Sequence, residues 1–196
     1  MKKIGTKIVT VLAACAALVL ASCAQPSTSG SVAEARPEAG AGGNDDKVVL
    51  GLLSMDGWGN YDISDKSATG FTMKSNAAQS ENDCGGADIT FGTAKKVTFK
   101  VTNNATEECW VQVIIKKDGA EGSGSRITSA KLDGVNVTGD ITWGVNTTIA
   151  AGASKNFELV LTGTDADKFV FSLNSNADSL SKTSGDVTIS EAYMYK

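Results

Sequence analysis

The three tryptophans are the residues of this chain whose chemistry and setting best suit them to bind a ligand. Trp58 lies in the segment Asp56-Gly57-Trp58-Gly59-Asn60-Tyr61, where glycines and polar residues leave it little core to join. Trp110 belongs to a strand-like segment, and Trp143 ends another before a turn containing Gly and Asn. Exposed aromatic rings can stack on sugar rings while polar neighbours fix the sugar hydroxyls. These residues therefore predict a carbohydrate-binding surface.

Each aromatic residue also has a structural interpretation that the sequence leaves open. Trp58 and Tyr61 could lie exposed on a loop or strand edge, or Trp58 could cap one end of a sandwich. Trp110 points to solvent if the Cys109 side of its strand faces the core, but Ile114 shares its face and could be buried with it. Polar partners for a sugar are Gln112, beside Trp110, and also Asp56, Asn60, Asp62, Asn146 and Asn174.

The composition excludes several classes of function. The chain has no histidine, which removes a Ser-His-Asp or Cys-His arrangement and the commonest general base. Its carboxylates are scattered over predicted turns, and nothing marks the pair that a glycoside hydrolase needs. The net charge of −4 argues against a nucleic-acid partner, because phosphate binding needs a basic patch. We therefore expect a protein that is not an enzyme and has no cofactor.

Beyond residue 46 the chain alternates apolar and polar residues, which predicts half-buried strands. The alternation is clearest in segments 97–102, 109–116, 157–161 and 169–173. A continuous apolar run, 48–53, predicts a strand buried on both faces. Further candidate strands are 70–74, 87–91, 126–132, 135–138, 140–143 and 185–195. About nine to eleven short strands with no helix of useful length predict an all-β antiparallel β-sandwich or jelly roll.

The last candidate strand contains a conflict between alternation and charge. Strict alternation from Val187 through Ile189 would place Glu191 on the same side as these apolar residues and bury it. A β-bulge at Ser190-Glu191 instead aligns Val187 and Ile189 with Ala192 and Met194. This register avoids a buried carboxylate without a partner, so we predict the bulge. Tyr193 and Tyr195 then face outward.

Three segments resemble parts of galactose-binding-like jelly rolls, which include many bacterial carbohydrate-binding modules. The segment Val187-Thr-Ile189-Ser-Glu-Ala192-Tyr-Met194 is similar to their closing strand, 97–103 to a strand that ends in Asn, and 148–161 to a loop followed by a strand. Modules of this type often hold a structural Ca²⁺ on carboxylate and carbonyl oxygens. The resemblance therefore makes Asp62 and Asp186 candidate metal ligands. Solvated turn aspartates are the alternative that we favour.

The first 23 residues resemble a bacterial lipoprotein signal peptide. Three lysines give a positive start, and the apolar run 8–20 is shorter than the roughly 20 residues that span a membrane. The segment Leu20-Ala21-Ser22-Cys23 resembles a lipobox, which implies that Cys23 is lipidated and begins the mature chain. Residues 24–46 are rich in small and polar residues and hold both prolines. We expect a signal peptide at 1–22, a lipidated flexible linker at 23–46 and the β-sandwich domain at 47–196.

Two cysteines remain after Cys15 leaves with the signal peptide and Cys23 takes lipid. An even pair such as Cys84 and Cys109 predicts a disulfide in an oxidising compartment. Closing a loop of roughly 25 residues would stabilise the fold by about 3 kcal/mol. Two buried thiols are the alternative.

These observations favour a monomeric lipoprotein of the bacterial cell envelope that binds a polysaccharide or oligosaccharide without catalysis. Ala24 follows Cys23, and lipoproteins with this pattern are generally sent to the outer membrane or cell surface. The alternative is a structural or adhesive protein whose sandwich binds another protein. Tryptophans clustered on one exposed face would support a sugar-binding platform, whereas tryptophans packed inside would leave no site.

Overall fold

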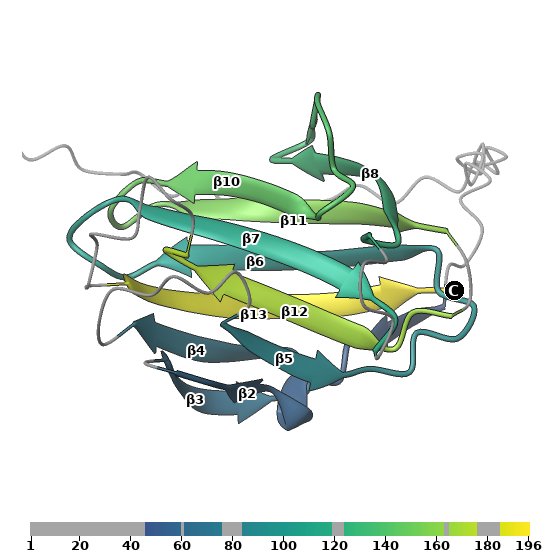
Figure 1. Ribbon diagram of the computed structural model, residues 1–196, viewed down its shortest axis with the longest axis horizontal. Helices are drawn as coiled ribbons and strands as arrows, with labels where there is room; N and C mark the ends of the chain where they lie inside the picture. Colours follow the sequence, from purple (N-terminus) through teal and green to yellow (C-terminus); the bar gives the residue numbers. More distant parts are fainter. Residues whose placement is uncertain (1–45, 60, 76–83, 119–123, 163–164, 176–184) are drawn as a thin grey trace, which may run out of the picture. The chain divides into compact units, whose positions relative to one another are not determined.

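The computed structural model describes residues 46–196 except 60, 76–83, 119–123, 163–164 and 176–184 (Figure 1). All the described residues belong to one unit, Ala41–Lys196. Two antiparallel sheets pack face to face, so the predicted all-β sandwich is confirmed, and its architecture is compatible with a jelly roll. Among these residues no helix is long and apolar enough to cross a membrane. The predicted signal peptide, Cys23 and almost all of the linker lie outside the described residues.

The larger sheet has eight strands in the order β3-β4-β13-β6-β11-β8-β9, with β1 paired to β13. The central strand β13 pairs with β6 along one side and with β4 and β1 along the other. The strands are β1 (Lys47–Val49), β3 (Tyr61–Ser67), β4 (Gly70–Ser75), β6 (Lys96–Asn103), β8 (Ile127–Leu132), β9 (Val135–Asn136), β11 (Ser154–Leu161) and β13 (Gly185–Tyr195).

The smaller sheet has five strands in the order β10-β7-β12-β5-β2, and its long strands lie in front of the larger sheet in Figure 1. Strand β7 alternates without interruption between buried and half-buried residues, as its sequence predicts. The strands are β2 (Asp56–Gly57), β5 (Gly85–Asp88), β7 (Cys109–Lys116), β10 (Val145–Ile149) and β12 (Lys168–Leu173).

Phenylalanine rings join the two sheets in the core. Phe99 of β6 stacks on Phe157 of β11 with ring centroids 4.8 Å apart, and its edge meets Phe169 of β12 in the opposite sheet at 5.8 Å. Phe71 of β4 and Phe171 of β12 make a second edge-to-face contact across the sandwich at 6.0 Å. All five rings are at most 3% exposed. The inward positions of both sheets therefore form one continuous core.

The predicted bulge in β13 is confirmed. The pairing of β13 with β6 shifts between Ser190 and Tyr193, and Glu191 has a left-handed φ of 54°. Val187, Ile189, Ala192 and Met194 are all buried, whereas Glu191 is exposed. Gly70 lies beside the bulge, where a β-carbon would come within 2.2 Å of the Ile189 carbonyl oxygen. The bulge is therefore accommodated by the absence of a side chain at Gly70.

The apolar run 48–53 is not the single buried strand that we expected. Strand β1 ends at Val49, Gly51 adopts a left-handed φ of 87°, and a short 3-10 helix, η1 (Leu52–Ser54), follows. Leu50 and Leu52 are buried, but Leu53 is 61% exposed. Apolar content alone does not distinguish a buried strand from a turn that inserts two leucines into a core.

The region around Trp143 also differs from the expected strand 140–143. These residues form a turn, and the strand β10 begins after them at Val145. The turn needs a residue with a left-handed backbone, which Gly144 supplies at φ 102°. The strand β10 is short and mostly polar outside its ends, so alternation gave little signal for it.

Candidate functional site

Trp58 and Trp110 lie on the outer side of the five-stranded sheet, and Trp143 lies in the turn before its edge strand β10. We call this surface the tryptophan face and define it by Trp58, Trp110, Trp143, Gly86, Gln112, Ile114, Lys168, Val170 and Ser172. The alternating positions of β7 and β12, such as Val111 and Phe171, are buried in the core. Because successive strand residues point to opposite sides, the residues of the tryptophan face on these strands point away from the core.

Trp58 lies directly after β2, and its ring covers the backbone of β5. Its N–H donates to the Cys84 carbonyl at 3.1 Å. A β-carbon on Gly86 would come 3.4 Å from the tip of the Trp58 ring, whereas one on Gly85 would meet the core methionines. Gly86 therefore faces outward, toward the Trp58 ring. The side chain is 39% exposed, so the prediction of an exposed Trp58 is confirmed.

Trp143 is held at the opposite edge of the sheet by its own turn. Asp140 Oδ1 accepts hydrogen bonds from the N–H of Thr142, at 2.8 Å, and from its hydroxyl. These bonds, the hydroxyl first, hold the pKa of the Asp140 carboxyl below its usual value. The Thr142 carbonyl accepts the Ser125 N–H at 2.6 Å, and the Trp143 carbonyl accepts Gln112 Nε2 at 2.9 Å. Trp143 itself is 59% exposed, so a fixed backbone presents a free ring.

Trp110 is half-buried at the start of β7. Its backbone pairs with Asn174, whose Oδ1 accepts the Trp110 N–H at 2.9 Å and whose N–H donates to the Trp110 carbonyl at 2.8 Å. Asn174 has a left-handed φ of 50°, which an asparagine tolerates better than most residues. Its Nδ2 is a buried donor without a hydrogen-bond partner. Asn174 thus extends the pairing of β12 with β7 and positions the backbone of Trp110.

An uncharged row of residues crosses the sheet between Trp58 and Trp143. Gly86 pairs with Val170, and Val170 pairs with Ile114. At the next strand, a β-carbon on Gly144 would come 2.8 Å from Ile114 Cγ1. Val170 is 1% exposed and lies outside the main core. Three strand spacings of about 4.8 Å put the two ends of the row about 14 Å apart.

Polar rows flank this uncharged row on both sides. On one side Gln112 pairs with Ser172 and with Asn146. On the other side Lys168 pairs with Lys116 and with Asp88, and its ammonium lies 3.6 Å from the Asp88 carboxylate. Gly86, Val170 and Ser172 are buried, so the parts of these rows that a ligand on the tryptophan face would meet are the half-buried Ile114, Gln112 and Lys168.

Tyr61 does not belong to this surface, so its prediction as an exposed binding residue is wrong. It is 6% exposed, and its hydroxyl donates to the Leu173 carbonyl at 2.8 Å. Tyr61 begins the edge strand β3, where its ring reaches the core and its hydroxyl finds a backbone acceptor. A tyrosine can bury its ring in this way because the polar tip finds a partner.

The predicted disulfide between Cys84 and Cys109 is also wrong, because the two are separate buried thiols. Cys84 Sγ accepts the Leu173 N–H at 3.0 Å, and Cys109 Sγ donates to Asn103 Oδ1 at 3.2 Å. Cys84 comes just before β5 and Cys109 begins β7, and strand β12 lies between β5 and β7 in the sheet. Two strand spacings of about 4.8 Å exceed the Cα separation that a disulfide spans. Burial raises the pKa of the Cys84 thiol.

The candidate metal ligands Asp62 and Asp186 lie on either side of Lys74. Asp62 of β3 and Asp186 of β13 both pair with Lys74 of β4, whose ammonium is 3.2 Å from the Asp186 carboxylate. Asp186 also accepts a hydrogen bond from Asn104 Nδ2 at 3.0 Å. A lysine therefore neutralises the carboxylate that would bind a cation. In the described part of the chain, no group of three or more acidic or cysteine side chains could hold a metal ion.

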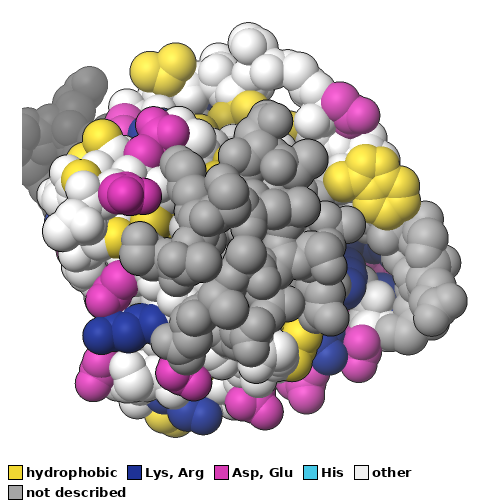
Figure 2. All heavy atoms as spheres, turned by 60° about the vertical axis from the view of Figure 1, so that its left-hand side comes forward, with side chains coloured by type: hydrophobic (Ala, Val, Ile, Leu, Met, Phe, Trp, Pro, Cys, Tyr) yellow, Lys and Arg dark blue, Asp and Glu magenta, His cyan; other side chains and the backbone are white. Residues whose placement is uncertain are grey.

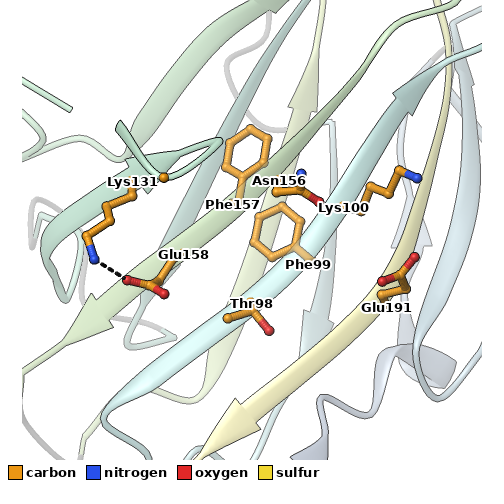
Figure 3. A pocket seen from close by; sticks show the side chains of 9 residues that line it. Thr98, Phe99, Lys100, Lys131, Asn156, Phe157, Glu158 and Glu191 are labelled. Carbon is orange, nitrogen blue, oxygen red and sulfur yellow. Dashed lines mark hydrogen bonds and ion pairs between the residues drawn. The ribbon is translucent and has the colours of Figure 1, made fainter. Parts of the chain in front are cut away.

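A hollow that the sequence did not predict lies on the outer side of the eight-stranded sheet (Figure 3). It has a volume of about 300 Å³ and crosses the adjacent strands β13, β6, β11 and β8. We call it the charged pocket, lined by Thr98, Phe99, Lys100, Lys131, Gly134, Asn156, Phe157, Glu158 and Glu191. Only the strand register brings these residues together, since they are spread over 94 positions of the sequence, from 98 to 191.

The surface seen in Figure 2 carries acidic and basic side chains interspersed with one another, and its apolar side chains occur in separate patches. The chain matches no protein-family model and no curated protein sequence. The chemistry of the tryptophan face and of the charged pocket is therefore the guide to function.

Proposed function

We propose that this chain is a lipid-anchored protein that binds carbohydrate on the tryptophan face without catalysis. The observation that carries the proposal is the position of Trp58 and Trp110 on the outer side of one sheet and of Trp143 at the edge of that sheet, with Trp58 39% exposed and Trp143 59% exposed. Large aromatic rings are among the side chains most often concentrated at binding surfaces.

The rows of the tryptophan face match the amphipathic nature of a sugar. Pyranose rings expose C–H groups on their faces and hydroxyls at their edges, so they need apolar contact and polar partners at once. The exposed side chains of Trp58 and Trp143 and the half-buried side chain of Ile114 supply the apolar contact. Gln112 supplies an amide at one border, and Lys168 supplies an ammonium at the other. A few placed polar groups around an apolar centre are typical of small-molecule sites.

A glycan array followed by calorimetry of the purified protein tests this proposal. We expect Trp58→Ala, Trp110→Ala and Trp143→Ala each to weaken binding by about tenfold or more, as truncation of a central aromatic contact usually does. Val135→Ala is the matched control, because Val135 is 70% exposed on β9 of the other sheet. We expect it to leave the affinity unchanged.

Two results would contradict the proposal: no glycan is bound, or the bound glycan is held equally well by all three tryptophan variants. A defined protein partner whose binding requires the same tryptophans would favour the alternative, a structural or adhesive role. Turnover of any glycan by the purified protein would contradict the non-catalytic part of the proposal.

The lipid anchor rests on the segment Leu20-Ala21-Ser22-Cys23. A linker of about 23 residues has a root-mean-square reach of roughly 25 Å, enough to separate the sandwich from lipid headgroups. Labelling of cells with radioactive palmitate tests this part. We expect Cys23→Ala to lose the label and Cys15→Ala, within the apolar run, to keep it. Equal labelling of the two variants would contradict lipidation at Cys23.

A further inference from the structure

The charged pocket carries an inference that is independent of carbohydrate binding. Its lining includes two lysines and two glutamates, so the charges cancel within it. Lys131 and Glu158 pair in register on β8 and β11, and their charged atoms lie 2.9 Å apart (Figure 3). Lys100 and Glu191, on β6 and β13, form no ion pair or side-chain hydrogen bond among the described residues. The pocket therefore holds one satisfied ion pair and one open pair of opposite charges.

The backbone places Glu191 in this pocket at an energetic cost. Glu191 is the exposed residue of the β13 bulge and has a left-handed φ of 54°, which is uncommon for a residue other than glycine. Bulges often re-aim a side chain and occur next to functional sites. The bulge that presents Glu191 also requires a residue without a side chain at position 70, which is Gly70. Two unusual backbone features thus serve to present one carboxylate beside Lys100.

The charge arrangement excludes simple ions as the preferred ligand. A cation would be attracted by Glu191 but repelled by Lys100 and Lys131. An anion would be attracted by the two lysines but repelled by Glu191. Phe99 and Phe157 line the floor, but their rings are buried in the core, so the pocket offers no exposed aromatic ring for stacking. The remaining ligands are small polar molecules that satisfy both open charges.

We infer that the charged pocket binds a free α-amino acid with a polar side chain. Lys100 is in register with Ser190, the residue before Glu191, so the two open charges come from adjacent strands. An α-amino acid carries its carboxylate and ammonium on neighbouring atoms, so it can place the carboxylate on Lys100 and the ammonium on Glu191. Hydrogen bonds between charged groups are roughly twice as strong as neutral ones. The polar side chain then lies over Thr98 and Asn156, toward the Lys131–Glu158 pair.

Titration of the purified protein with L-serine, N-acetyl-L-serine and L-serine methyl ester, followed by NMR, tests this inference. The two capped forms each lack one charge of the free amino acid. We expect L-serine to bind and each capped form to bind about tenfold more weakly, since one charge-assisted contact is lost. Glu191→Gln should abolish the discrimination against N-acetyl-L-serine, and Lys100→Met should abolish the discrimination against the ester.

Glu107→Gln and Lys66→Met are matched controls, because both residues are exposed outside the pocket and their substitution should leave all three affinities unchanged. Thermal unfolding checks that every variant is folded. Equal binding of the free and capped forms by the unmodified protein would overturn the inference, as would the absence of L-serine binding. Binding of glucose that both Glu191→Gln and Lys100→Met weaken, without discrimination among the serine forms, would make the pocket a polyol site and also overturn it.

Discussion

The tryptophan face and the charged pocket lie on opposite sheets of one sandwich and differ in the chemistry that they offer. Across the five-stranded sheet the outward positions from Gly86 to Ile114 are uncharged, and tryptophans stand at both ends of the row. Across the eight-stranded sheet the outward positions carry Lys100, Glu158 and their neighbours. The difference shows that a shared core leaves each outer face free to take its own chemistry.

The two surfaces also depend on glycine in different ways. On the tryptophan face a β-carbon on Gly86 would crowd the Lys168 side chain beside the Trp58 ring, and Gly144 allows the turn that presents Trp143. At the charged pocket Gly70 leaves space for the bulge that presents Glu191. In each case the functional side chain is adjacent to a position where a β-carbon would not fit or would crowd a neighbour. Four predictions test how separate the two surfaces are.

The largest effect is expected from the core that the surfaces share. Phe99 stacks on Phe157 under the charged pocket and contacts Phe169 under the tryptophan face. We expect Phe99→Ala to lower the free energy of unfolding by about 4 kcal/mol, measured by urea denaturation, because it leaves a cavity between the sheets. Val160→Ala on the outer side of β11 should cost less than about 1 kcal/mol. Equal costs would show that the sheets do not share this core.

Substitution of Gly144 should affect the tryptophan face alone, and substitution of Gly70 should affect the charged pocket alone. A β-carbon on Gly144 would lie 2.4 Å from the Val113 carbonyl oxygen, and one on Gly70 would lie 2.2 Å from that of Ile189. We expect each alanine variant to cost about 3 kcal/mol in urea denaturation. Gly144→Ala should also weaken glycan binding but spare serine binding, and Gly70→Ala should do the reverse.

Gly152→Ala is the control for Gly144→Ala. Gly152 has a left-handed φ of 69° but open space around its missing β-carbon, so only the backbone strain applies. We expect a cost of about 1 kcal/mol and no effect on either ligand. If Gly144→Ala costs no more than this control, the close contact with Val113 is unimportant.

Alkaline pH should act on the core through the Cys84 thiol. Burial raises the pKa of the Cys84 thiol above its value of 9.0 in the unfolded chain. Its contribution to stability is therefore complete below pH 9 and is lost as the pH rises toward the folded pKa. We expect the free energy of unfolding to fall more between pH 8 and about 10 in the unmodified protein than in Cys84→Ala. Parallel pH profiles would contradict this assignment.

The smallest expected effect is a gain in stability from the strained residue of the charged pocket. Glu191→Gly should raise the free energy of unfolding by about 0.5–1 kcal/mol, because glycine adopts a left-handed backbone without strain. The same variant should lose the binding of L-serine. Asp65→Gly, at φ 52° on the edge strand β3, is the control that should gain stability and keep serine binding. A loss of stability in Glu191→Gly would show that the bulge is not strained.

Local patterns in the sequence predicted the regular part of the fold well. Strands β6, β7, β11 and β12 occur where apolar and polar residues alternate, because one side of each faces the core. The bulge at Glu191 was also predictable, because strict alternation within this one strand would bury a carboxylate without a partner. Asp133-Gly134 is a dipeptide typical of a hairpin turn, and both residues have a positive φ there.

Errors arose where distant strands decide a residue's surroundings. Tyr61 begins a polar strand, so its burial depends on the core that other strands provide. Cys84 and Cys109 formed a plausible pair by count, but an intervening strand separates them. The charged pocket gave no sequence signal because its residues come from four strands. No local pattern encodes which strands become neighbours.

The sequence by itself determined the strands in which apolar and polar residues alternate clearly, which side of these strands enters the core and that tryptophans would stand in polar surroundings. These properties follow from side-chain transfer free energies acting over a few residues. Only the tertiary structure decided that Trp58 and Trp110 share one face, with the turn of Trp143 at its edge, and that Glu191 lies beside Lys100. Strand order and register fix such neighbours, and they result from packing the entire core at once.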